Sequence, residues 1–202
     1  MQQENFSPQD SLRVIQSMLE KSKQDIRGND IYFLMWGWIT FIACTGQFLL
    51  KRVFDYPYHY RVWWLTILGV LLTVYIAMRQ KNAKKVRTYI EESMGFLWIG
   101  MGISFFVLTA LFFKIGWGSP VFPFFIMLYG LGTFVSGCLL RFRPFIVGGI
   151  SAWVIAIAAA FMEYDYQILM AGLAIMVSYI IPAYMLRSKT GNTNRKVSVG
   201  AI

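Results

Sequence analysis

Six long runs without a single charged residue set what this chain can fold into. Each run is close to the ~20 residues that an α-helix needs to cross a ~30 Å hydrocarbon core. Their apolarity is continuous rather than alternating, which favours helices over a β-barrel. We therefore predict an all-α integral membrane protein whose six transmembrane helices occupy residues 31–50, 62–78, 94–113, 119–140, 145–162 and 166–186.

A shared template divides these runs into pairs. A phenylalanine near the start of each odd-numbered run is followed 18 residues later by the first charge, as in Phe33 and Lys51, Phe96 and Lys114, and Phe145 and Glu163. Each even-numbered run ends at an arginine: Arg79, Arg141 or Arg187. The pattern predicts three tandem helical hairpins. Span length is set by the bilayer, so the sequence leaves open whether the repeat reflects duplication.

The basic residues lie mostly on one side of the predicted bundle. Of the 19 Lys and Arg residues, 15 fall on the side of both chain ends and 4 on the opposite side. Cations in short cytoplasmic loops set orientation, so we expect both termini in the cytoplasm. The short loops, the lack of a signal-peptide pattern and the lack of an outward-facing glycosylation sequon favour a plasma membrane of the bacterial inner-membrane type. This distribution explains the net charge of +9 by topology and argues against nucleic acid as a partner.

Residues 1–30 predict an amphipathic cytoplasmic helix that precedes the 31–186 bundle. Ser7 and Pro8 suit a helix start, and Gly28 suits its end. The apolar face carries the candidate docking residues Leu12, Ile15, Leu19 and Ile26. The segment holds four cations and five acids, so attraction to anionic lipid is weak. The alternatives are docking on its own bundle, on a second copy, or on a cytoplasmic protein partner.

The 79–93 segment is the longest connection between predicted spans, and it is basic. Its five cations include Lys84, Lys85 and Arg87. These three residues complete the candidate docking set, for an acidic partner or for lipid head groups; topology alone is the alternative explanation. The tail, residues 187–202, is polar and basic, and we expect it to be disordered in the cytoplasm.

Small residues recur at every fourth position of two spans. One stripe consists of Gly148, Ala152, Ala156 and Ala160, and the other of Gly69, Thr73 and Ala77. Such stripes let two helices approach closely in lipid, where van der Waals contact drives association. We predict that they are helix-packing surfaces. Internal packing and a homodimer seam are the two alternatives for the first stripe.

Four polar residues and one helix-breaking proline near the ends of the spans have ordinary explanations. Gln47 lies near the outer end of its span, so we expect its amide to reach water there. His59 is the only histidine and reads as an interfacial loop residue. We interpret Glu163 and Asp165 as part of a solvated turn, with attraction of a cation as the alternative. Pro182 frees a backbone carbonyl and is a candidate kink or hinge.

The spans carry no pattern of catalytic chemistry. They contain no Asp, Glu, Lys, Arg or His, which argues against an intramembrane protease and against a carboxylate-coupled pump. We therefore predict no catalytic, cofactor or metal site. The favoured function is a membrane adaptor or regulatory subunit that presents its N-terminal helix and the 79–93 segment to a cytoplasmic partner. The alternative is a facilitative transporter or channel-like carrier of a neutral or apolar small molecule.

Overall fold

A computed structural model describes residues 30–83, 89–116 and 120–188 of the chain. These residues form helices joined by short connections, and no strand occurs among them. The main elements are α2 (Asp30–Arg52), the 3₁₀-helix η1 (His59–Trp64), α3 (Leu65–Ala83), α4 (Tyr89–Ile115), α5 (Val121–Leu139), α6 (Arg143–Ala160), α7 (Tyr164–Ile175) and the π-helical segment η2 (Met176–Ile180). The chain remains helical after η2 through residue 188.

Six of the helical stretches are long and apolar enough to cross a membrane, and each overlaps one predicted run. They begin and end where the local chemistry requires. Lys51 and Arg52 lie in the last turn of α2, where cations stabilise the helix C-terminus. Pro120 precedes α5, and Gly116, with a φ of 103°, follows α4. The prediction of an all-α, multi-pass membrane protein is confirmed at this level.

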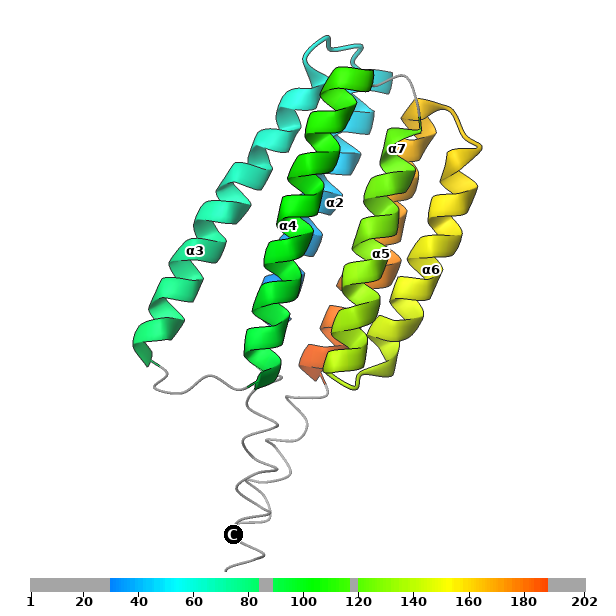
Figure 1. Ribbon diagram of the computed structural model, residues 1–202. Helices are drawn as coiled ribbons and strands as arrows, with labels where there is room; N and C mark the ends of the chain where they lie inside the picture. Colours follow the sequence, from blue (N-terminus) through cyan, green and yellow to red (C-terminus); the bar gives the residue numbers. More distant parts are fainter. Residues whose placement is uncertain (1–29, 84–88, 117–119, 189–202) are drawn as a thin grey trace, which may run out of the picture.

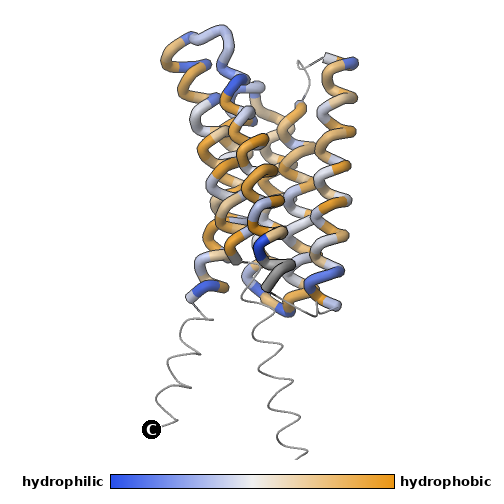
Figure 2. Tube along the Cα trace, turned by 90° about the vertical axis from the view of Figure 1, so that its left-hand side faces the viewer, coloured by the Kyte–Doolittle hydropathy of each residue, from blue (hydrophilic) through white to orange (hydrophobic). Residues whose placement is uncertain are grey.

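Successive helices run alternately up and down in one bundle (Figure 1). The connections 53–58 and 161–163 lie at one end, which we call the Asp55 end; the α5–α6 connection lies at the other, which we call the Arg141 end. Hydrophobic residues dominate the helix lengths, whereas hydrophilic residues gather near the ends (Figure 2). This pattern fits helices that cross an apolar layer between two aqueous faces.

Four helices form the centre of the bundle, and two lie outside it. Within the 18-residue apolar stretch of each span, 50% of the residues are buried in α5 and 56% in the last span, which contains α7. The corresponding shares are 6% for the span of α3 and 11% for α4. Helices α2, α5, α6 and α7 therefore build the core, and α3 and α4 present most of their surface to the surroundings.

The core is divided into two clusters. Near the Arg141 end, the rings of Phe33, Phe145 and Tyr179 pack together, with ring centroids 4.6 Å apart for Phe33–Phe145 and 5.1 Å for Phe33–Tyr179. Toward the Asp55 end, Cys44, Phe122 and Ile168 lie in a second cluster with the alanines of α6 and α7. Both clusters combine residues from the first and the last spans, so the bundle closes on itself.

Helices α5 and α6 make the most extensive contact among the described elements. Glycines allow their backbones to approach. A Cβ atom placed on Gly149 would lie 2.8 Å from the Gly130 carbonyl oxygen, and one on Gly137 would lie 2.7 Å from the Ile146 nitrogen. These two helices belong to different predicted hairpins, so the grouping into three tandem hairpins stays a prediction.

Candidate functional site

The predicted docking residues fall outside the part of the chain that the structure describes. This applies to Leu12, Ile15, Leu19 and Ile26 of the predicted N-terminal helix and to Lys84, Lys85 and Arg87 of the basic segment. The segments 1–29 and 189–202 are likewise outside the described residues. The docking surface therefore remains a prediction.

The stripe on α6 changes its surroundings along the helix. A Cβ atom on Gly148 would lie 2.6 Å from the carbonyl oxygen of Ser178, so α6 touches the backbone of the last span there. Ala152 and Ala156 are also buried, whereas Ala160, at the Asp55 end, is exposed. Three of the four predicted packing residues thus face the interior of this chain.

The stripe on α3 receives an aromatic side chain from α2. A Cβ atom on Gly69 would lie 3.3 Å from the Trp36 ring. The Trp36 indole N–H donates to the Thr73 hydroxyl over 3.0 Å, and that hydroxyl donates to the Gly69 carbonyl over 2.8 Å. Ala77, one turn further along, is half-buried. This contact attaches the outlying helix α3 to the core.

Gln47 is the centre of a polar cluster at the Asp55 end. Gln47 is only 2% exposed, and its amide oxygen accepts a 2.6 Å hydrogen bond from the Trp63 indole. The amide nitrogen lies 3.4 Å from Nδ1 of His59. The expectation that Gln47 reaches water is therefore wrong. A buried amide requires hydrogen-bonding partners, and η1 folds back over α2 to supply them.

An ion pair joins the first and last spans in the same cluster. Lys51, at the end of α2, pairs with Asp165 in the first turn of α7, and its ammonium also lies 4.4 Å from the centroid of the Tyr164 ring. The interpretation of Asp165 as part of a solvated turn is wrong. The two side chains are 32% and 23% exposed, so the pair contributes about 1 kcal/mol or less.

Two buried polar atoms in the described residues have no hydrogen-bond partner. One is Oε1 of Gln167, whose amide nitrogen donates to the Met162 carbonyl over 2.9 Å. The other is the hydroxyl of Ser178, a residue with no exposed surface. Buried polar groups are normally paired, and each unpaired group costs about 1–3 kcal/mol. These atoms mark the two places where packing overrides hydrogen bonding.

Ser178 lies in the π-helical segment of the last span, four residues before Pro182. Proline lacks an N–H group and its ring clashes with the carbonyl of residue i−4, which here is Ser178. The wider turn relieves this clash: the Ile181 N–H donates to the Met176 carbonyl, five residues back. Gly37 and Gly148 flank the widened segment, since a Cβ on either would lie within 2.8 Å of it.

Together these contacts hold spans to one another. The Asp55-end cluster joins α2, η1 and α7, and a 2.9 Å hydrogen bond between Thr40 and the Tyr129 hydroxyl joins α2 to α5. Among the described residues, no three His, Cys, Asp or Glu side chains gather closely enough to hold a metal ion. The arrangement is suited to fixing helix positions.

The sequence contains each member of the Asp55-end cluster but gives no sign that they meet. Lys51 and Asp165 are 114 positions apart; Lys51 follows the first apolar run, and Asp165 precedes the last. The useful signal was Gln47 itself, an amide inside a span that requires a partner.

In comparisons with known protein families, characterised proteins and solved structures, the chain has no significant match.

Proposed function

We propose that the chain is a non-enzymatic membrane adaptor or regulatory subunit. In this proposal the six-helix bundle is a scaffold, and the N-terminal segment and the 79–93 segment are presented to a cytoplasmic protein. The chain resides in a plasma membrane with both termini in the cytoplasm, and its spans are arranged as three successive hairpins. Positive charge gathered on the side of the two termini supports this orientation.

One observation carries the proposal: the polar groups of the described spans are largely paired within the protein, either between helices or with the backbone of their own helix. Trp36 donates to Thr73, Trp63 donates to Gln47, and Thr40 bonds with Tyr129. Other hydroxyls donate to carbonyls of their own helix, at Ser104, Thr109, Thr133, Ser136 and Ser151. A path for a polar solute would need such groups to line an open space instead. Recognition then falls to the segments outside the membrane.

The partner can be tested on the apolar face of the N-terminal segment. We expect the double variant Ile15→Asp, Leu19→Asp to lose a cytoplasmic protein that co-purifies with the full chain in stoichiometric amount, because charge on that face prevents burial. The matched control Gln16→Asp, Gln24→Asp adds the same charge to the predicted polar face and should retain it. Equal recovery with both variants, or no stoichiometric protein with the unmodified chain, would contradict the adaptor proposal.

Sidedness can be tested separately with an impermeant thiol reagent on intact cells. In a background with Cys44 and Cys138 replaced by alanine, Gly118→Cys should react and Asn82→Cys should be protected. The reverse pattern would place the N-terminal segment outside the cytoplasm and remove its proposed partner.

The carrier alternative is favoured by a single observation, the unpartnered hydroxyl of Ser178 beside the widened turn of the last span. Such turns are frequent at functional sites in helices. Purified protein in liposomes should then conduct a neutral solute, and Ser178→Ala should change the rate. A panel of neutral solutes without protein-dependent flux would leave the adaptor proposal standing.

A further inference from the structure

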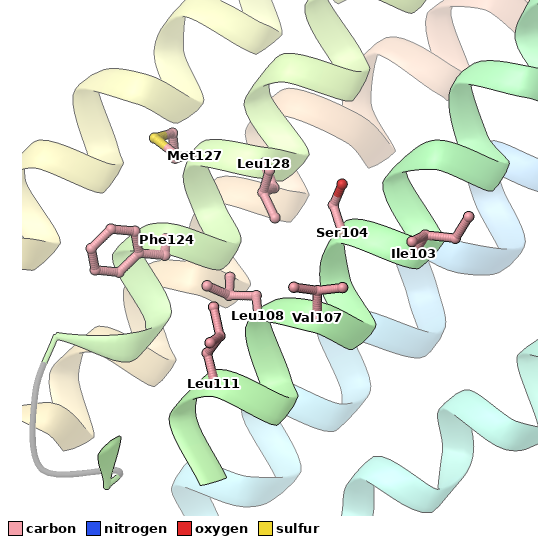
Figure 3. Close-up of a pocket in the computed structure, with 8 residues that line it drawn as sticks. All are labelled: Ile103, Ser104, Val107, Leu108, Leu111, Phe124, Met127 and Leu128. Carbon is pink, nitrogen blue, oxygen red and sulfur yellow. The ribbon is translucent and has the colours of Figure 1, made fainter. Parts of the chain in front are cut away.

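Two apolar furrows run along the bundle surface on either side of helix α5. The first lies between α4 and α5 and encloses about 300 Å³ (Figure 3). The second lies between α5 and α6 and encloses about 640 Å³. Phe124, Met127 and Leu128 line both, so they form a ridge with one furrow on each side.

The furrows have the chemistry of a lipid-tail site. The α5–α6 furrow is lined only by apolar residues, apart from the indole N–H of Trp153, which donates to the Met127 carbonyl over 3.1 Å. The one hydroxyl of the α4–α5 furrow, Ser104, donates to the Gly100 carbonyl over 2.9 Å. Each polar group is thus already paired, and the remaining lining suits hydrocarbon.

The length of the larger furrow corresponds to one leaflet. It extends from Pro120, at the Asp55 end, to Leu131, eleven residues along α5. At ~1.5 Å per residue this is about 16 Å, or half of a ~30 Å hydrocarbon core. A transmembrane helix of a second copy would need a seam along the whole thickness, and its 10–12 Å diameter would meet the α5 ridge.

Small residues of α6 make the space. Ala156 and Ala160 line the α5–α6 furrow, and Ala160 is exposed. On the same helix, the backbone of the last span occupies the space that a side chain at position 148 would need. The stripe therefore packs against protein toward the Arg141 end and borders an open furrow toward the Asp55 end.

A cation lies at the head-group end of the furrows. Lys114 is exposed and follows Leu111, which lines the α4–α5 furrow, by three residues, or about one helical turn. At the same end, Lys51 is paired with Asp165, and the Arg61 guanidinium lies 4.3 Å from the centroid of the Tyr58 ring. Arg52 and Glu163 are exposed and belong to other connections. Among the described residues at the Asp55 end, Lys114 is therefore the charged residue that lies on a helix bordering the furrows.

We propose that one diacyl phospholipid binds here, with an acyl chain in each furrow astride the α5 ridge and its phosphate on Lys114. Lipid tails are as apolar as the furrow lining, so burial alone gives no preference for this site over the bilayer. Selectivity comes from the fit of two chains to two furrows and from the contact of phosphate with ammonium. The proposal is independent of the adaptor function.

Native mass spectrometry of the full chain, delipidated in detergent and titrated with dioleoyl phosphatidylglycerol, tests this site. Ala160→Trp fills the larger furrow and should weaken binding of one lipid by roughly tenfold, the change that ~1.4 kcal/mol produces. The control Ala158→Trp, at an exposed position of α6 outside the furrow, should leave binding unchanged. Lys114→Gln should weaken binding by roughly fivefold, and the control Arg52→Gln should not.

Further arms separate the alternatives. Monooleoyl phosphatidylglycerol, with one chain, should bind more weakly than the two-chain lipid, and dioleoyl phosphatidylcholine should retain dependence on Ala160. If Ala160→Trp and Ala158→Trp weaken lipid binding equally at equal thermal stability, the proposed site is wrong. It is also wrong if the chain forms a dimer that Ala160→Trp abolishes, because a second copy would then occupy the furrow. If Ala160→Trp does not fold, a photoreactive acyl chain should label Met127 and Leu128 of the unmodified chain; labelling confined to α3 would overturn the proposal.

Discussion

Helices α4 and α6 both carry glycines inside an apolar span, yet these glycines lie in opposite surroundings. On α6, a Cβ atom at Gly148 or Gly149 would come within 2.6 Å of neighbouring atoms. On α4, a Cβ atom at Gly95, Gly100 or Gly102 would meet no heavy atom within 4 Å. The same residue type thus marks the tightest helix contact of the bundle and one of its most open surfaces.

A small residue in a span therefore permits close packing but does not by itself bring a neighbouring helix close. In lipid, helices associate through van der Waals contact and hydrogen bonds, so a neighbour must offer a complementary surface. Helix α5 offers one to α6, with Gly130 facing Gly149 and Gly137 facing Ile146. Helix α4 meets α5 along a furrow instead.

The largest effect is expected at the centre of the α5–α6 contact. Gly149→Leu places a side chain where the Gly130 carbonyl oxygen is 2.8 Å and the Phe134 backbone nitrogen is 2.8 Å from a Cβ atom. Backbone atoms cannot move aside as a flexible side chain can, so we expect a loss of about 3 kcal/mol or more in the free energy of unfolding. Reversible unfolding in mixed detergent micelles measures it. An unchanged unfolding curve would show that the two helices do not meet in this way.

A smaller loss is expected at Ala156, two turns further along α6 than Gly149. Ala156 borders the α5–α6 furrow but is only 7% exposed, so neighbouring residues cover most of its surface. Ala156→Leu overfills this site, and we expect about 1–3 kcal/mol of destabilisation. Val154→Leu, at a position that is 63% exposed, is the matched control and should change stability by less than about 0.5 kcal/mol. Comparable thermal stability of the two variants would mean that Ala156 has no tightly packed neighbour.

The attachment of α3 should depend on one hydrogen bond. Thr73→Val keeps the side-chain shape but leaves the Trp36 N–H without its acceptor, so we expect a loss of about 1 kcal/mol. Thr109→Val is the control, because the Thr109 hydroxyl donates to the Phe105 carbonyl of its own helix. Trp fluorescence should shift in the first variant only. A shift in neither would place Trp36 away from α3.

The smallest effect is expected on α4. Gly102→Ala adds a methyl group to open space and removes backbone freedom from the unfolded chain, so the free energy of unfolding should rise by at most about 1 kcal/mol. Reversible unfolding in mixed detergent micelles measures this change, as for Gly149→Leu. A clear destabilisation would indicate that a second molecule packs on this face of α4, which would remove its contrast with α6.

The number and extent of the spans could be predicted because the bilayer imposes them. A run of about 20 uncharged residues has few alternatives to a helix, and charges such as Lys51 and Lys114 end it. Which spans are central could not be predicted. Every run is apolar on all sides, so no amphipathic face points to a neighbour, and glycines occur on α4 as well as on α6.

The polar cluster escaped prediction for a related reason. Gln47, His59 and Asp165 each have an ordinary explanation when considered alone, as an end-of-span amide, a loop imidazole and a turn carboxylate. Their joint role depends on α2 and α7 lying side by side, and the two helices are far apart in the sequence. The structure brings them together: the Gln47 amide nitrogen lies 3.4 Å from Nδ1 of His59, and Asp165 pairs with Lys51, one helical turn after Gln47.

The widened turn at Met176–Ile180 also determines which way the side chains of the last helical turns face. A π-type turn accommodates an extra residue, and one residue corresponds to about 100° of rotation around a helix axis. The positions that follow are therefore re-aimed as a block, including Tyr184, whose hydroxyl accepts a hydrogen bond from Trp38. Removing a single residue from the turn would rotate that block by more than a quarter circle about the helix axis, so Tyr184 would lose its contact with Trp38.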